Sequence, residues 1–527
     1  ENLYIEGDNL DVLKLLQETY LGKIKMIYID PPYNTGNDFV YNDDFAEDAD
    51  TYLANSGQFD AEGNRLVQNT ESNGRFHTDW LNMIYPRLKL AKDLLTEDGV
   101  IFISIDENEV ENLKKVGNEV FGEQNFVGAV IWERAFAPKN DAKYFSDSHD
   151  YVVVYAKSLG SFTIGLLPRT EDANARYKNP DDDPRGPWTP DNMTVKTYSA
   201  AYDYEIVTPS GKVVKPTDGR CWFTSKERMQ KLISEGRVWF GENGSNMPRL
   251  KRYLADVQQG MTSTTIWKYT EVGHNQEGRQ EVKKLFDDKG YFDGPKPIRL
   301  LNRILQIANT DKNSIILDFF SGSATTAHAV MQLNAEDGGN RKFIMVQLPE
   351  ETDKKSEAYK AGYKNICEIG KERIRRAGKK IKDESPLTTQ NLDTGFRVLK
   401  LDSSNMKDVY YTPADYEMSM FDTLADNIKE DRTPEDLLFQ VMLDLGVLLS
   451  SKIEETTIAG KKVFNVADGF LMACFDENVS DETITAVAKQ KPYYFVMRDS
   501  SLASDSVATN FDQIFATYSP DTVRKVL

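Results

Sequence analysis

The sequence is poor in the side chains that build metal sites and disulfide frameworks. Its 527 residues include three cysteines (Cys221, Cys367 and Cys474) and four histidines. The cysteines are too widely spaced for a CxxC motif or a disulfide framework, so we expect no metal site and a reducing, cytoplasmic environment. The sequence also lacks any run of about 18 apolar residues, so we expect no membrane-spanning helix. Its length suffices for several domains.

Positive charge is also scarce. The chain has 64 lysines and arginines against 83 acidic residues, which gives a formal net charge of −19. A protein this acidic does not bind polyphosphate indiscriminately. The acidic excess is concentrated in residues 1–130 and 385–527, whereas residues 131–384 are mildly basic. We therefore expect any contact with nucleic acid to lie in the middle of the chain.

What the sequence does contain is a buried strand that ends in a rigid polar turn. Residues Met26 to Ile29 are apolar, and Asp30-Pro-Pro-Tyr33 follows directly. Two prolines end the strand ladder and stiffen the turn, which lies at the carboxyl end, where open α/β sheets bind ligands. An exocyclic amine of a nucleobase could donate to the Asp30 carboxylate and the Pro31 carbonyl while the base stacks on Tyr33. An ordinary strand-end turn is the alternative interpretation.

A second buried strand, 314–318, leads into a turn of small residues, 321–324, and then into a helix from Thr325. Small residues let the backbone approach a ligand, and the start of a helix offers unpaired N–H groups to it. Upstream, Lys296 lies between two prolines at the start of another helix. A polar loop, 34–50, could close over the reacting centre.

Apolar runs alternate with amphipathic helices over much of the chain. This βαβ rhythm is typical of a doubly wound, mainly parallel α/β sheet. The rhythm breaks between 158 and 292, where turn residues and aromatics are mixed with bases such as Arg249, Lys251 and Arg252. Such a mixture suits base-edge and backbone contacts to DNA, and it equally suits any small mixed domain. The acidic residues 385–527 predict a separate α+β domain that repels phosphate and suits assembly better than DNA binding.

Together these features resemble the β class of nucleic-acid amino-methyltransferases. Asp30-Pro-Pro-Tyr33, the catalytic turn, is similar to the signature (D/N/S)PPY, in which a first aspartate indicates adenine N6 and serine more often cytosine N4. Asp318-Phe-Phe-Ser-Gly-Ser-Ala-Thr-Thr326, the donor loop, resembles the motif DxFxGxGTT, which binds S-adenosylmethionine. Ala324 replaces the second glycine of that motif, and we expect it to be accommodated with a negative φ. The order of catalytic turn, variable region and donor loop is that of the β class.

The resemblance implies roles for individual residues. The catalytic residues would be Asp30, Pro31, Pro32 and Tyr33. The S-adenosylmethionine site would comprise Asp8, Asn9, Lys296, Asp318, Phe320, Gly322, Ser323, Ala324, Thr325, Gln347 and Glu350. Within this set Asp8 would help to hold the donor's adenine, and Lys296 would approach its methionine carboxylate. The contact with the donor's ribose stays open between Gln347 and Glu350.

Over nearly the whole chain the sequence most resembles the modification subunit of Type III restriction-modification systems. The implied domains are the catalytic half of the methyltransferase domain at 1–157, a target-recognition domain at 158–292, the S-adenosylmethionine-binding half at 293–384 and a C-terminal assembly domain at 385–527. The implied partners are double-stranded DNA, a second copy of the chain and an ATP-dependent restriction subunit. A stand-alone DNA methyltransferase, an RNA or protein-glutamine methyltransferase, and a recognition module for a nuclease-helicase partner remain as alternatives.

Overall fold

The computed structural model of the chain describes residues 1–36, 39–41, 66–68, 76–138, 142–256, 260–407, 428–502 and 505–527. Most of the polar loop 34–50, which the sequence suggested as a cover for the reacting centre, lies outside these residues. The chain forms two compact units. One comprises Glu1–Gly165 together with Thr264–Leu527, and the other comprises Leu166–Ser263.

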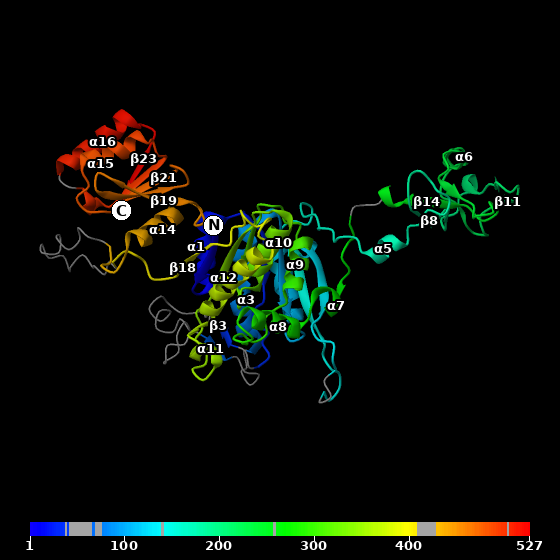
Figure 1. Cartoon of the computed structure of the whole chain (residues 1–527), viewed down its shortest axis with the longest axis horizontal. Helices are drawn as coiled ribbons and strands as arrows, with labels where there is room; N and C mark the ends of the chain where they lie inside the picture. The colour runs from blue at the N-terminus through cyan, green and yellow to red at the C-terminus, as the bar shows by residue number, and fades with distance from the viewer. Residues whose placement is uncertain are drawn as a thin grey trace. The chain divides into compact units, whose positions relative to one another are not determined.

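The larger unit is built on a nine-stranded sheet (Figure 1). Across the sheet the order is β15 (Ile266–Trp267), β6 (Phe126–Glu133), β7 (His149–Ala156), β5 (Leu95–Ile105), β2 (Ile24–Ile29), β16 (Ile315–Asp318), β17 (Lys342–Gln347), β1 (Asn2–Glu6) and β18 (Phe396–Lys400). All neighbours are parallel except β7, which is antiparallel to both β5 and β6. The predicted mainly parallel α/β sheet is confirmed.

Helices pack on the sheet because its central strands are apolar on both faces. Ile27 and Ile29 of β2 belong to one core cluster with buried side chains of α1 (Asn9–Tyr20), α3 (Phe76–Leu94) and α4 (Val110–Phe121). Met26 and Tyr28 alternate with them, are also buried, and therefore face the opposite layer. A second group of helices packs together outside that cluster: α8 (Asn275–Leu285), α9 (Ile298–Ile307), α10 (Thr325–Asp337) and α12 (Ile366–Glu384).

The strand order reverses between β2 and β16. From β2 the chain continues to β5 on one side, and from β16 it continues to β17 on the other. The carboxyl ends of β2 and β16 therefore form the topological switch point, where doubly wound sheets bind ligands. Asp30 follows β2 at this edge, and Phe319 follows β16. Because β7 is antiparallel, its first residues reach the same edge, where Asp150 pairs with Trp132 of β6.

The smaller unit, Leu166–Ser263, has a core of its own. Its main sheet contains β13 (Val238–Trp239), β14 (Arg249–Tyr253) and β8 (Trp188–Asn192) in that order, and α6 (Lys226–Ser234) follows the short strand β12 (Cys221–Trp222). Trp188, Trp222 and Phe240 are all buried in this unit. These three aromatics therefore contribute to the core of a small domain, which is one of the two interpretations that the sequence left open.

Lys251 on β14 corrects another expectation for this region. The sequence grouped it with bases that could reach DNA, but its side chain is 6% exposed and forms ion pairs with Asp181 and Asp183. The two carboxylates lie far from Lys251 in sequence, so the pairing could not be read from local composition. Arg249 on the same strand is exposed and keeps the orientation toward solvent that a phosphate contact requires.

A five-stranded sheet near the C-terminus forms the expected α+β region. Its order is β19 (Ile453–Ile458), β20 (Lys461–Val466), β21 (Leu471–Cys474), β22 (Tyr494–Met497) and β23 (Val523–Val526). The first two pairings are antiparallel, and the last two are parallel, with α15 (Asp481–Lys489) and α16 (Asp505–Tyr518) as crossovers. The three cysteines are free and buried. Within the described ranges, no helix has the length and apolar character needed to cross a membrane.

Candidate active site

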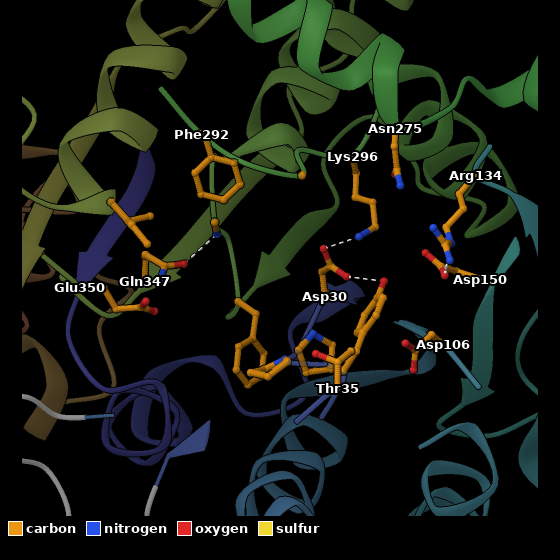
Figure 2. Close-up of a pocket in the computed structure, with 17 residues that line it drawn as sticks. Asp30, Thr35, Asp106, Arg134, Asp150, Asn275, Phe292, Lys296, Gln347 and Glu350 are labelled. Atoms are coloured by element: carbon orange, nitrogen blue, oxygen red, sulfur yellow. Dashed lines mark hydrogen bonds and ion pairs between the residues drawn. The ribbon is translucent and has the colours of Figure 1, made fainter. Parts of the chain in front are cut away.

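A cavity of about 630 Å³ lies at the switch point of the large sheet. The catalytic turn and Lys296 lie between its two sides (Figure 2). One side is formed by Phe292, Phe320, Gly322, Gln347, Glu350 and Ile366, and we call it the donor side. The other is formed by Asp106, Arg134, Asp150 and Asn275, and we call it the base side. The cavity thus brings together segments that are far apart in the chain.

Asp30 is held from two directions at the centre of the cavity. Its Oδ1 accepts a hydrogen bond from the Tyr33 hydroxyl at 2.9 Å. Its Oδ2 forms an ion pair with the Lys296 ammonium at 2.6 Å. The turn itself is fixed from below, because the indole N–H of the buried Trp80 donates to the Pro32 carbonyl at 2.7 Å. The carboxylate is therefore aimed into the cavity by a rigid support.

Tyr33 combines an aromatic face with a hydroxyl that stays protonated. Burial raises the pKa of the phenol well above its ordinary value, and the neighbouring Asp30 carboxylate raises it further. The hydroxyl therefore acts as a hydrogen-bond donor to Asp30 at any physiological pH. The Lys296 ammonium lies 5.2 Å from the centre of the Tyr33 ring, a cation–π distance.

The base side contains an ion pair between an arginine and an aspartate that the sequence analysis did not predict. Arg134 follows β6, and its Nε lies 2.7 Å from Oδ1 of Asp150 on β7. Burial raises the pKa of Asp150 to about 7, and the charges of Lys296 and Arg134 oppose that rise. Arg134 donates a further hydrogen bond to Asp147 at 2.7 Å. The base side is therefore polar, and ion pairs hold its side chains in place.

On the donor side, the backbone of the donor loop is held by three contacts. Gly322 N–H donates to the Gln347 side-chain oxygen at 2.7 Å. Phe320 N–H donates to Asp318 Oδ1 at 3.1 Å, and the Thr326 hydroxyl donates to Asp318 Oδ2 at 2.6 Å. Burial raises the pKa of Asp318 to about 7. Asp318 therefore braces the loop from inside the sheet.

The backbone conformation and the surroundings of position 322 favour glycine. Its φ is +50°, and a Cβ there would come within 3.1 Å of the neighbouring Phe292 ring. Ala324 differs from the expectation drawn from the sequence: its φ is +61°, in the left-handed region, and not negative. The reason is the tight closure of the turn, in which Ala324 N–H donates to the Ser321 carbonyl at 2.7 Å.

Several residues implied as donor ligands lie behind the cavity and not on its surface. They are Asp8, Asn9, Asp318, Ser323, Ala324 and Thr325. Asp8 caps α1, and Asn9 donates from its side-chain amide to the Phe319 carbonyl at 2.6 Å. These contacts tie α1 to the donor loop. Asp30, Pro31, Pro32, Tyr33, Lys296, Phe320, Gly322, Gln347 and Glu350 do line the cavity.

Sequence reasoning missed Asp106, Arg134, Asp150, Asn275 and Phe292, which also line the cavity. Asp106 directly follows β5, so the rule that parallel strands present ligands at their carboxyl ends could have found it. Asp150 could not be found in this way, because β7 runs in the opposite direction and places its first residues at that edge. Phe292 and Asn275 come from the connection and helix before α9, for which no local signal was available.

Comparison with known proteins identifies the family of the chain. The chain matches the N6/N4 methyltransferase family, described as DNA methylase, over residues 24–375. It is 43% identical over 404 residues to the Type III restriction-modification enzyme StyLTI Mod subunit of Salmonella typhimurium, covering 75% of this chain and 59% of that protein. The EcoP15I Mod subunit of Escherichia coli is 33% identical over 535 residues, covering 93% of this chain and 78% of that protein.

A solved structure of a DNA modification methylase from Thermus thermophilus, complexed with S-adenosyl-L-methionine, is similar over 76% of this chain and 100% of its own. Its sequence identity is 12%, and the TM-score is 0.31. The family match by itself spans both the catalytic turn and the donor loop, and it covers more than half of the chain. This chain therefore belongs to the family of N6/N4 DNA methylases.

Proposed function

We propose that the protein transfers the methyl group of S-adenosylmethionine to N6 of an adenine flipped out of a short duplex DNA sequence. The observation that carries this proposal is the position of Asp30 and Tyr33 at the centre of a two-sided cavity at the switch point. The carboxylate and the aromatic ring are the two groups that a flipped base with an exocyclic amine requires. Membership of the DNA methylase family supports the same conclusion.

On the base side, the amine is activated by hydrogen bonding alone. The lone pair of an exocyclic amine is delocalised into the ring, so the nitrogen is a poor nucleophile. Donation of its two N–H bonds to the Asp30 carboxylate and the Pro31 carbonyl draws the nitrogen toward tetrahedral geometry and exposes the lone pair. Stacking of the base on Tyr33 contributes about 1–3 kcal/mol of binding. The proton released on methylation leaves through Asp30.

The donor side fits S-adenosylmethionine by the chemistry of its side chains. Phe292 and Phe320 offer apolar faces to an adenine ring, and Lys296 offers a cation to a carboxylate. The Glu350 carboxylate makes no hydrogen bond or ion pair with any described residue, so it can accept the ribose hydroxyls. The Gln347 side chain already accepts from Gly322 and donates to the Leu348 carbonyl at 3.2 Å. We therefore assign the ribose contact to Glu350.

When bound there, S-adenosylmethionine would supply the electrophilic methyl group that the amine attacks. The protein contributes position: the catalytic turn is braced by Trp80, and the donor loop is braced by Asp318. Holding both reactants in a near-attack geometry can account for about 7–11 kcal/mol of the barrier. Aspartate at the first position of the catalytic turn favours adenine N6 over cytosine N4.

We further propose a division of labour between the parts of the chain. The unit Leu166–Ser263 has its own core and the exposed Arg249, and it would select the DNA sequence. The relatives StyLTI and EcoP15I are named as Mod subunits of Type III enzymes. By analogy, this chain would act as the modification and recognition subunit of such a system, as a homodimer that joins an ATP-dependent restriction subunit. The C-terminal sheet lies in an acidic part of the chain that would repel the phosphates of DNA, so we assign it to subunit assembly and not to DNA binding.

Transfer of labelled methyl from S-adenosylmethionine to varied genomic DNA tests the reaction. We expect label in N6-methyladenine with the wild type, loss of transfer in Asp30→Ala, and unchanged transfer in the control Asp521→Ala, which alters an exposed carboxylate. Label in N4-methylcytosine would overturn the assignment to adenine. Transfer to RNA or protein, or no transfer from a donor that binds, would overturn the assignment to DNA.

A further inference from the structure

Lys296 makes the two contacts that the proposed function assigns to the target base. Its ammonium lies 2.6 Å from Asp30 Oδ2 and 5.2 Å from the centre of the Tyr33 ring (Figure 2). The other carboxylate oxygen, Oδ1, accepts the Tyr33 hydroxyl at 2.9 Å. Lys296 therefore occupies the space beside Oδ2 that the target amine would need, and one face of Tyr33 has a cation over it.

A neutral amine is a weaker hydrogen-bond partner for Asp30 than this cation. A hydrogen bond between an ammonium and a carboxylate is roughly twice as strong as one from a neutral donor. The pair is partly buried, since the Lys296 side chain is 11% exposed and that of Asp30 is 26% exposed. Lys296 is therefore the stronger competitor for the position beside Oδ2, and a second anion is needed to draw the ammonium away.

The chain around Lys296 allows such a movement without a change of fold. Pro295 and Pro297 fix the backbone on both sides, and α9 begins at Ile298. The lysine side chain has a flexible four-carbon stem, so the ammonium can move several ångströms while the backbone stays in place. Lys296 lines the same cavity as the donor side, so its ammonium could pair with the carboxylate at the methionine end of S-adenosylmethionine if the donor were bound there.

We infer that Lys296 is a positioning residue that couples the two ligands, because its ammonium takes the place of the target amine on Asp30 until the donor's carboxylate draws it away. This inference rests on the proposed function. Donor binding then frees Oδ2 and one face of Tyr33 for the base. By linkage, a bound base strengthens donor binding by the same factor.

The test isolates the contribution of the exocyclic amine. The recognition sequence is first mapped from N6-methyladenine in genomic DNA methylated by the wild type. Two labelled duplexes are then compared by fluorescence anisotropy: one carries adenine at the target position, and the other carries purine, which lacks the amine. The donor side is filled with S-adenosylhomocysteine, which keeps the amino-acid carboxylate, or with methylthioadenosine, which lacks it.

For the wild type, we expect S-adenosylhomocysteine to increase the preference for adenine over purine by at least about fivefold, and methylthioadenosine to leave it unchanged. In Lys296→Met, which removes the charge and keeps the length, the preference should be high without any donor. Lys296→Arg keeps a cation beside Asp30 and should keep the dependence on the donor. Lys289→Met, at an exposed lysine on the same connection, is the matched control.

The outcomes separate this inference from the proposed function. A wild type that methylates no DNA overturns both. A wild type that methylates DNA overturns the inference alone if its preference for adenine is the same with and without S-adenosylhomocysteine. A Lys296→Met protein that still needs the donor to distinguish adenine from purine overturns it as well. Thermal unfolding of each variant excludes a general loss of structure as the cause.

Discussion

Arg373 donates to the hydroxyl of Thr325, with 2.7 Å between Nη1 and Oγ1. The same nitrogen donates to Ser323 Oγ at 2.8 Å. Arg373 is fully buried on α12, and its Nε and Nη2 find no hydrogen-bond partner among the residues that the structure describes. Burial lowers its pKa to about 10, so the side chain stays charged at neutral pH. A buried cation is thus kept behind the donor loop, where it fixes two of the loop's hydroxyls.

This arrangement predicts that Arg373→Met has a small effect on stability and a large effect on donor binding. An incompletely paired buried charge is costly, so an apolar side chain of similar volume should lower the free energy of unfolding by no more than about 1 kcal/mol. The donor loop loses two charge-assisted hydrogen bonds, so the affinity for S-adenosylhomocysteine should fall at least about tenfold. Calorimetric titration measures the affinity, and urea denaturation measures the stability.

Lys379→Met, at an exposed lysine on the same helix, is the matched control for Arg373→Met and should change neither quantity. If Arg373→Met lost several kcal/mol of stability while donor affinity was unchanged, Arg373 would be a fold-stabilising residue with no influence on the loop.

The left-handed conformation of Ala324 predicts a stabilising substitution. An L-residue with φ of +61° carries a strain of about 1–2 kcal/mol, which Ala324→Gly removes. Glycine also makes the unfolded chain more flexible, which costs about 0.4–1 kcal/mol. The net gain in the free energy of unfolding should be about 0.5–1 kcal/mol by denaturant titration. Ala329→Gly, inside α10, is the control and should lower the free energy of unfolding by about 1 kcal/mol. A lower free energy of unfolding in both variants would contradict the strain at Ala324.

The parts of the site that sequence could predict are those built from one continuous segment. The catalytic turn follows from an apolar strand, two prolines and a tyrosine, and the donor loop follows from a strand, small residues and a helix. Each pattern is local, so its structure is decided by neighbours in the chain. The α/β sheet was predictable for the same reason, since its strands and helices alternate along the sequence.

The parts that sequence could not predict depend on partners far along the chain. Asp150 reaches the cavity because β7 is inserted antiparallel between β5 and β6, and an apolar run does not show its direction. Lys251 was wrongly grouped with exposed bases because its partners Asp181 and Asp183 lie about 70 residues earlier. The sign of φ at Ala324 is set by the closure of its turn, not by the size of its side chain.

The two proposed roles of Tyr33 predict that Tyr33→Phe slows methyl transfer less than Tyr33→Ala does. Tyr33→Phe keeps the ring and removes the hydroxyl that donates to Asp30 Oδ1 at 2.9 Å. We expect kcat/KM to fall by about tenfold, the value of one hydrogen bond to a charged group. Tyr33→Ala also removes the stacking surface, which contributes about 1–3 kcal/mol to binding of the base. We therefore expect kcat/KM to fall by a further factor of about 5–150. Equal effects of the two substitutions, measured by steady-state transfer to DNA, would show that the ring does not contact the base.

Glu350 predicts a pH dependence of donor binding. Burial raises the pKa of this carboxyl from its ordinary 4.5 to about 7, and no described residue pairs with it. The ionised form accepts hydrogen bonds from two ribose hydroxyls, whereas the protonated form has lost part of this capacity. The affinity for S-adenosylhomocysteine should therefore rise by up to about tenfold between pH 6 and pH 8. Asp150 and Asp318 titrate in the same range, so the relevant quantity is the difference between wild type and Glu350→Gln.

The same pKa shift fixes the sign of the effect of Glu350 on stability. Between pH 4.5 and 7 the folded protein holds a proton on Glu350 that the unfolded chain has released, so the free energy of unfolding falls as pH rises. The slope from one such group is at most about 1.4 kcal/mol per pH unit. Glu350→Gln should remove this contribution to the slope and should make donor affinity less dependent on pH. Glu351→Gln, at the exposed neighbouring residue, is the control and should change neither quantity. If stability flattened in Glu350→Gln but the pH dependence of donor affinity remained, the carboxyl would be a buried structural group and Gln347 the ribose ligand.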